Sequence, residues 1–96
     1  MREVEIDIPG IDDTAGAVRR VEAILKSRGL TMHSRGSVKR YPGCTHWHWR
    51  NGRHTGTLEV TLWPAKRRLW FKVQSARAAP WIDQLMPALK ADLEKG

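Results

Sequence analysis

The chain has 96 residues, and its 17 basic and 10 acidic side chains give a formal net charge of +7. This length suits a single domain (residues 1–96), and a hydrophobic fraction of 41% is typical of a globular chain rather than a disordered one. The single cysteine excludes an intramolecular disulfide scaffold, and no apolar run is long enough for a membrane span. The first ten residues lack the apolar stretch of a signal peptide, so we expect a cytoplasmic protein without a membrane partner.

The positive charge is concentrated in the middle of the chain. Residues 26–77 contain 12 basic residues and one acidic residue, Glu59, so this segment carries +11, whereas the segments on either side carry −3 and −1. A basic block attracts polyanions through phosphate contacts and counterion release. It is equally compatible with an ordinary solvated surface, so the charge alone does not define a partner.

The first part of the chain predicts a strand followed by a helix. Apolar residues alternate with acidic ones over residues 3–8, which is typical of a half-buried strand, and Pro9-Gly10 ends it. Apolar residues then recur at helical spacing, which predicts a helix over about 12–28 with its N-cap among residues 12–14. Gly29 follows as a natural C-terminal capping residue.

Residues 30–41 predict a less regular strand with a bulge or bend near Gly36, and Pro42-Gly43 predicts a turn after it. The next strand ends at Asn51-Gly52, which favours a two-residue hairpin turn. Such a turn pairs Arg50 with Arg53 and Cys44 with Glu59.

A second hairpin is predicted around a four-residue loop at residues 64–67, which pairs Trp63 with Arg68 and Leu58 with Val73. The two hairpins assign the same faces to the strands they share, and a slip of one residue would destroy that agreement. The face expected to point into the core carries Thr45, Trp47, Trp49, Leu58, Val60, Leu62, Leu69, Phe71 and Val73. The opposite face carries Cys44, His46, His48, Thr55, Thr57, Glu59, Thr61, Trp63, Arg68, Trp70, Lys72 and Gln74.

A second amphipathic helix is predicted after a lead-in at residues 75–79, with Pro80 in its first turn and Pro87 as a point where it kinks or restarts. The order β-α-β-β-β-β-α, with one apolar face per element, predicts a two-layer α+β sandwich. Both helices are expected on one face of an antiparallel sheet, which leaves the other face open.

The expected open face combines aromatic and basic side chains, which is the combination that single-stranded nucleic acid requires. Rings stack on bases while cations contact phosphates, and sheet-based RNA-recognition modules use this arrangement. We therefore expect a small, non-enzymatic binding domain for single-stranded RNA or DNA. The expected contact residues are Trp63, Arg68, Trp70, Lys72, His46, His48, Arg50, Arg53, Lys66 and Arg67.

Two alternatives use the same face. Exposed tryptophans also suit a protein-interaction or homodimer surface. Alternation places Cys44, His46 and His48 on one face with Glu59 opposite Cys44, and these are acceptable ligands for a metal or side chains that bind a small ligand. No nucleophile elbow, P-loop or HExxH motif is present, so neither an enzyme nor a cofactor is expected.

Overall fold

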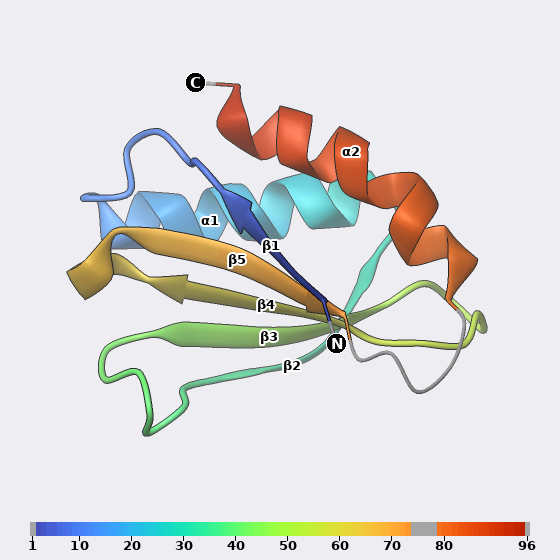
Figure 1. Ribbon diagram of the computed structural model, residues 1–96, viewed down its shortest axis with the longest axis horizontal. Helices are drawn as coiled ribbons and strands as arrows, with labels where there is room; N and C mark the ends of the chain where they lie inside the picture. Colours follow the sequence, from blue (N-terminus) through green and yellow to red (C-terminus); the bar gives the residue numbers. More distant parts are fainter. Residues whose placement is uncertain (1, 74–78, 96) are drawn as a thin grey trace.

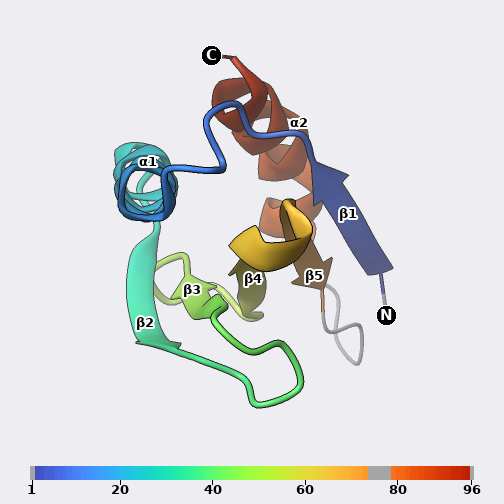
Figure 2. The ribbon, with the colours of Figure 1, turned by 90° about the vertical axis from the view of Figure 1, so that its left-hand side faces the viewer.

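The computed structural model describes residues 2–73 and 79–95, and it shows a five-stranded antiparallel sheet in the order β1-β5-β4-β3-β2 (Figure 1). Both helices lie on one face of this sheet, so the predicted two-layer α+β class and element order are confirmed (Figure 2). The elements are β1 (Arg2–Ile6), α1 (Thr14–Ser27), β2 (Thr31–Gly36), β3 (Thr45–Arg50), β4 (Leu58–Trp63), a short 3-10 turn η1 (Pro64–Lys66), β5 (Arg68–Val73) and α2 (Pro80–Glu94).

Helix α1 begins and ends where its capping residues predict. The Asp13 carboxylate accepts a hydrogen bond from the Gly16 amide at 3.1 Å, which satisfies one of the free N–H groups at the start of the helix. Gly29 follows the C-cap residue Arg28 and has a φ of +83°, a conformation that glycine adopts without strain.

Strand β2 is irregular, but its bulge lies earlier than predicted. The pairing with β3 shifts between Met32 and Ser34, so His33 is the extra residue, and Gly36 is the last residue of the strand. The first strand also ends at Ile6, and Ile8 is buried in the connection that follows it.

The β3–β4 pairing differs from the predicted register by four positions. Thr45 pairs with Leu62 instead of Leu58, because residues 51–57 form a longer connection than the expected two-residue turn. Contacts with α2 explain the difference: the Trp81 indole donates to the Thr55 carbonyl oxygen at 2.8 Å. Four is an even number, so the side chains within β3 and β4 keep their predicted faces although their partners change, whereas Thr55 and Thr57 lie in the connection instead of a strand.

Gly56 lies inside this connection with a φ of +109°, and a Cβ there would meet the Cβ of Ala79 at 2.6 Å. The connection therefore packs directly against the start of α2. By contrast, the β4–β5 hairpin has the predicted register from Trp63↔Arg68 to Leu58↔Val73, because η1 closes it locally.

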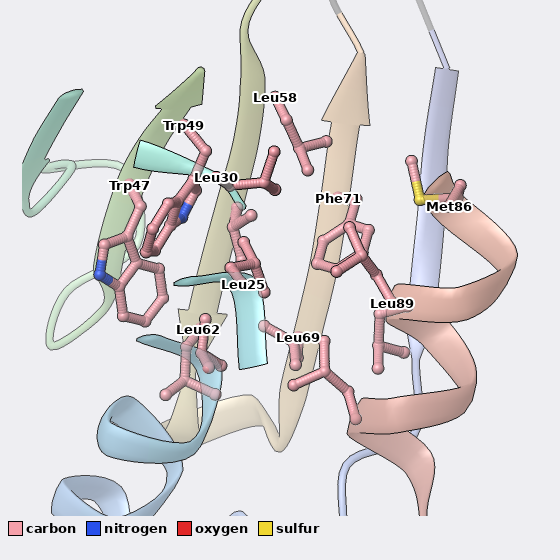
Figure 3. Close-up of a cluster of buried hydrophobic side chains, with 14 of the residues drawn as sticks. Leu25, Leu30, Trp47, Trp49, Leu58, Leu62, Leu69, Phe71, Met86 and Leu89 are labelled. Carbon is pink, nitrogen blue, oxygen red and sulfur yellow. The ribbon is translucent and has the colours of Figure 1, made fainter. Parts of the chain in front are cut away.

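The core fills the space between the sheet and the helices (Figure 3). Trp47, Trp49 and Phe71 are fully buried on the inner face, as predicted, and Leu25 of α1 and Leu89 of α2 pack against this layer. Helix α2 is one helix with Pro87 inside it, so it does not restart there. The predicted lead-in to α2 lies largely outside the described residues, as does Gln74. Within the described part of the chain, no helix is long and apolar enough to cross a membrane.

Leu25→Ala tests this packing. Leu25 has no exposed surface, so its truncation should lower the free energy of unfolding by about 2–5 kcal/mol in urea denaturation. Lys26→Ala, an exposed neighbour on the same helix, should change it by less than about 0.5 kcal/mol. Equal effects of the two variants would contradict the assigned core.

Candidate functional site

The outer face of the sheet is not fully open, because the connection between β2 and β3 folds back across it (Figure 2). The Tyr41 ring lies 4.9 Å from the Trp63 ring and 5.2 Å from the Trp70 ring, centroid to centroid. The Trp63 indole donates to the Pro42 carbonyl oxygen at 2.9 Å, which fixes the same connection. Trp70 is consequently only 3% exposed, whereas the sequence predicted an open surface around it.

The basic residues predicted for this face are distributed unevenly. Arg68 pairs with Glu5 and lies 4.2 Å from the centre of the Trp70 ring, and Arg67 pairs with Asp12. Acidic residues near the N-terminus therefore compensate part of the positive charge of the central segment.

The other predicted cations lie at different ends of the sheet. Lys66 is exposed in η1, beyond the last residue of β4, whereas Arg50 and Arg53 are exposed near the end where β4 begins. Lys72 lies on β5, directly across from Glu59 on β4 and from Glu3 on β1. The structure thus does not bring all of the predicted contacts into one continuous surface.

Cys44 is separated from the two histidines with which the sequence grouped it. It is buried, and its Sγ accepts a hydrogen bond from the Val38 amide at 3.4 Å. This contact ties the β2–β3 connection to the start of β3. The residue that completes the cluster is Glu59, which faces His48 across the ladder rather than Cys44.

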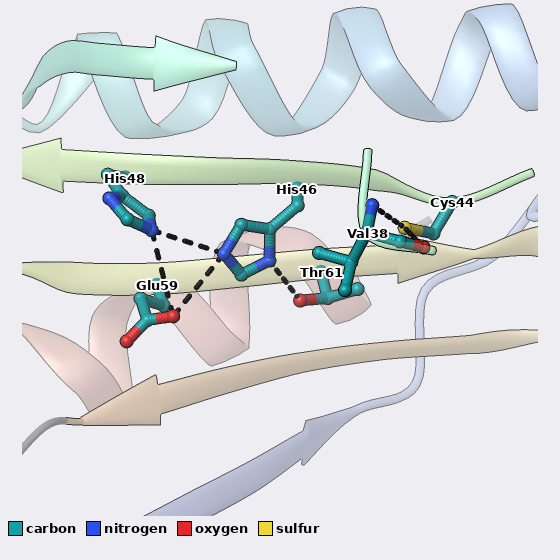
Figure 4. Close-up of polar contacts among 6 residues, drawn as sticks. All are labelled: Val38, Cys44, His46, His48, Glu59 and Thr61. Atoms are coloured by element: carbon teal, nitrogen blue, oxygen red, sulfur yellow. Dashed lines mark hydrogen bonds and ion pairs between the residues drawn. The ribbon is translucent and has the colours of Figure 1, made fainter. Parts of the chain in front are cut away.

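His46, His48 and Glu59 converge on the outer face (Figure 4). His46 Nε2 lies 3.2 Å from His48 Nε2 and 3.3 Å from Glu59 Oε1, and His48 Nε2 lies 3.7 Å from the same oxygen. His46 Nδ1 is hydrogen-bonded to the Thr61 hydroxyl at 2.7 Å, on the residue opposite it in β4. Two adjacent strands therefore bring three possible ligand atoms together. Thr61 fixes the orientation of the His46 ring through the other ring nitrogen.

These separations match what a tetrahedral metal site requires. Metal–ligand bonds of about 2.0–2.1 Å imply ligand atoms about 3.3–3.4 Å apart. The three observed distances lie between 3.2 and 3.7 Å. Thr61 occupies the place of the outer partner that commonly fixes the tautomer of a metal-bound histidine.

The burial of Glu59 and of His46 favours the binding of a cation at this site. Glu59 is 7% exposed, and its Oε2 has no hydrogen-bond partner among the described residues. Burial lowers the pKa of His46, an effect that the nearby Glu59 carboxylate opposes and that His48 and Lys72 reinforce. His46 is therefore neutral at pH 7, which is the form that binds metals.

A pocket of about 180 Å³ adjoins the cluster. The sheet contributes His46, Glu59, Thr61, Trp70 and Lys72 to its lining. The β2–β3 connection contributes Arg40 and Tyr41 from the opposite side, so the pocket exists because that connection covers the sheet.

Comparison with family models, with curated proteins and with solved structures gave no match to this chain. A functional argument therefore depends on the geometry and electrostatics of the site. Sequence reasoning placed His46, His48 and Thr61 correctly on one face, but it named neither Thr61 nor Tyr41 as a site residue. It placed Glu59 opposite Cys44, whereas the structure places this acid opposite His48, with its carboxylate close to both histidines. The available signal was that Glu59 is the one acid in the +11 segment.

The pKa of His46 gives a test of this geometry in metal-free protein. We expect an NMR titration of its ring protons to have a midpoint below the ordinary value of 6.5. Because the unfolded chain then binds the proton more readily, the free energy of unfolding should fall as pH drops from about 6.5 through the folded-state pKa.

Two variants should move this midpoint in opposite directions. Glu59→Gln removes the anion that favours protonation and should lower the pKa of His46 further, whereas Lys72→Met removes a repelling cation and should raise it. A His46 midpoint at or above 6.5 in the wild type would contradict the described burial.

Proposed function

We propose that this protein binds one transition-metal ion, of the Zn²⁺ class, through His46 Nε2, His48 Nε2 and Glu59 Oε1. The observation that carries the proposal is the convergence of these three ligand atoms within 4.8 Å of one another. Imidazole nitrogen and carboxylate oxygen are ordinary zinc ligands. The unpaired Oε2 of a buried carboxylate adds to the argument, because an uncompensated buried acceptor is costly and a bound cation offsets that cost.

Three protein ligands leave one tetrahedral position for water or another molecule. Structural zinc sites are usually closed by four protein ligands, whereas sites with two histidines and one carboxylate are typical of catalytic or ligand-binding metals. Such an ion supplies Lewis acidity and lowers the pKa of a bound water. The part of this chain is to favour the neutral form of His46 by burial, orient its ring through Thr61 and place the ion beside the pocket.

Metal binding is tested on protein purified without a histidine tag. We expect calorimetric titration with Zn²⁺, and absorption titration with Co²⁺, to give one ion per chain. His46→Ala, His48→Ala and Glu59→Gln should each weaken binding by at least about tenfold, because each removes one of three ligands.

Three variants serve as matched controls. Cys44→Ser, His33→Ala and His54→Ala should keep wild-type affinity, since none of these residues belongs to the cluster. If Cys44→Ser were the only one of these three controls to lose metal binding, the result would support the ligand set predicted from the sequence, Cys44, His46 and His48. An unchanged affinity in Glu59→Gln would refute the set proposed here.

Nucleic-acid binding is a second candidate, supported by unpaired cations at one rim of the sheet. Lys39, Arg40 and Lys66 are exposed, and no ion pair joins them to any described residue. Trp63 lies half-buried at the end of the strand that precedes Lys66, so part of this aromatic residue is exposed near these cations. This surface is smaller than the one predicted from the sequence, because Tyr41 covers Trp70.

A fluorescently labelled single-stranded oligonucleotide tests this candidate by anisotropy at several salt concentrations. We expect log K to fall linearly with log salt, and Lys39→Ala combined with Lys66→Ala to reduce the slope by about 1–2. Arg50→Ala at the other end of the sheet is the control and should leave the slope unchanged. Binding that is absent at low salt would exclude this candidate, and sedimentation of the free protein would then reveal whether the face forms a homodimer instead.

A further inference from the structure

The pocket beside the cluster has its own chemistry. His46 and Glu59 belong both to the cluster and to the pocket lining, so a molecule in the pocket adjoins the proposed ion. Its volume of about 180 Å³ suits a small molecule. A ligand in this pocket would therefore contact the ion and the pocket side chains together.

The charges around the pocket favour an anion once the ion is bound. Lys72 and Arg40 line it, and neither makes an ion pair with a residue that the structure describes. Glu3 and Glu59 are the acids that line it. A divalent ion with these four side chains gives a net positive lining, and the low dielectric of a partly enclosed pocket strengthens its attraction for an anion.

The remaining walls are aromatic. Tyr41 and Trp70 meet edge to face at 5.2 Å and both line the pocket. Rings in that position contact the apolar part of an organic ligand, while a cation and a metal ion hold its charged end.

We propose that this pocket binds a small organic oxyanion, a carboxylate or a phosphate, with one oxygen on the open position of the metal and its charge next to Lys72. This inference rests on the metal site proposed above. Arg40, on the covering connection, faces the same pocket and supplies the second cation. The apolar part of the ligand packs against Tyr41.

The experiment uses Co²⁺-loaded protein, because the visible spectrum of Co²⁺ reports a new ligand directly. Benzoate and inorganic phosphate are the two probes, one with an apolar body and one without. We expect benzoate to change the spectrum with a Kd of about a millimolar or below, and phosphate to bind more weakly because it makes no ring contacts. Phosphate binding tighter than benzoate assigns the site to phosphate-bearing ligands.

Variants separate this inference from the metal site. Lys72→Met should weaken the binding of the benzoate probe by about tenfold while the Co²⁺ affinity is kept or increased, since a repelling cation is lost. Lys66→Met, on the exposed turn, should leave both unchanged. Failure to bind Co²⁺ overturns both proposals. Co²⁺ binding without a spectral response to either probe overturns only the oxyanion proposal, and so does a response to the probes that is the same in Lys72→Met as in the wild type.

Discussion

The antiparallel pairing of β3 with β4 is the constraint on which the rest of the structure depends. Alternation along β3 sends Trp47 and Trp49 into the core and His46 and His48 to the outer face. Burial of each tryptophan removes roughly 150–250 Å² from water, worth about 4–6 kcal/mol at most. A slip of one residue would place the imidazoles of His46 and His48 in the core and the two indoles on the outer face. The hydrophobic layer therefore holds the polar cluster in place, at the strand pair where Glu59 meets the histidines.

The β2–β3 connection turns a sheet surface into a pocket. Its contacts are of different kinds: the Cys44 thiol with the Val38 amide, the Trp63 indole with a carbonyl, and the Tyr41 ring against two tryptophans. Each is weak alone, but together they hold the connection over β4 and β5. Without this cover Trp70 would be an exposed aromatic surface, and His46 would lose part of the burial that lowers its pKa.

Local patterns predicted much of this structure, and long-range contacts account for what they missed. Strand faces follow from alternation, and the β4–β5 register follows from a short turn, so both were predicted correctly. The β3–β4 register depends on how Thr55 and Gly56 pack against the start of α2, more than twenty residues later in the chain. The same limit applies to the site: the histidines share a face by parity, but the identity of their third partner required the register. Tyr41 was missed because a loop position carries no periodic signal.

Glu59 links the charge distribution of the chain to its fold. It is the one acid among residues 26–77, yet it is buried rather than exposed on a surface where a counter-charge would be useful. Lys72 lies opposite it in the ladder but does not form an ion pair with it in the structure, so the carboxylate depends on two imidazoles. A neutral imidazole compensates a buried carboxylate poorly, whereas a protonated one or a metal ion compensates it well. A metal ion bound there would therefore compete with protons for these atoms, and near neutral pH the lowered pKa of His46 would favour the metal.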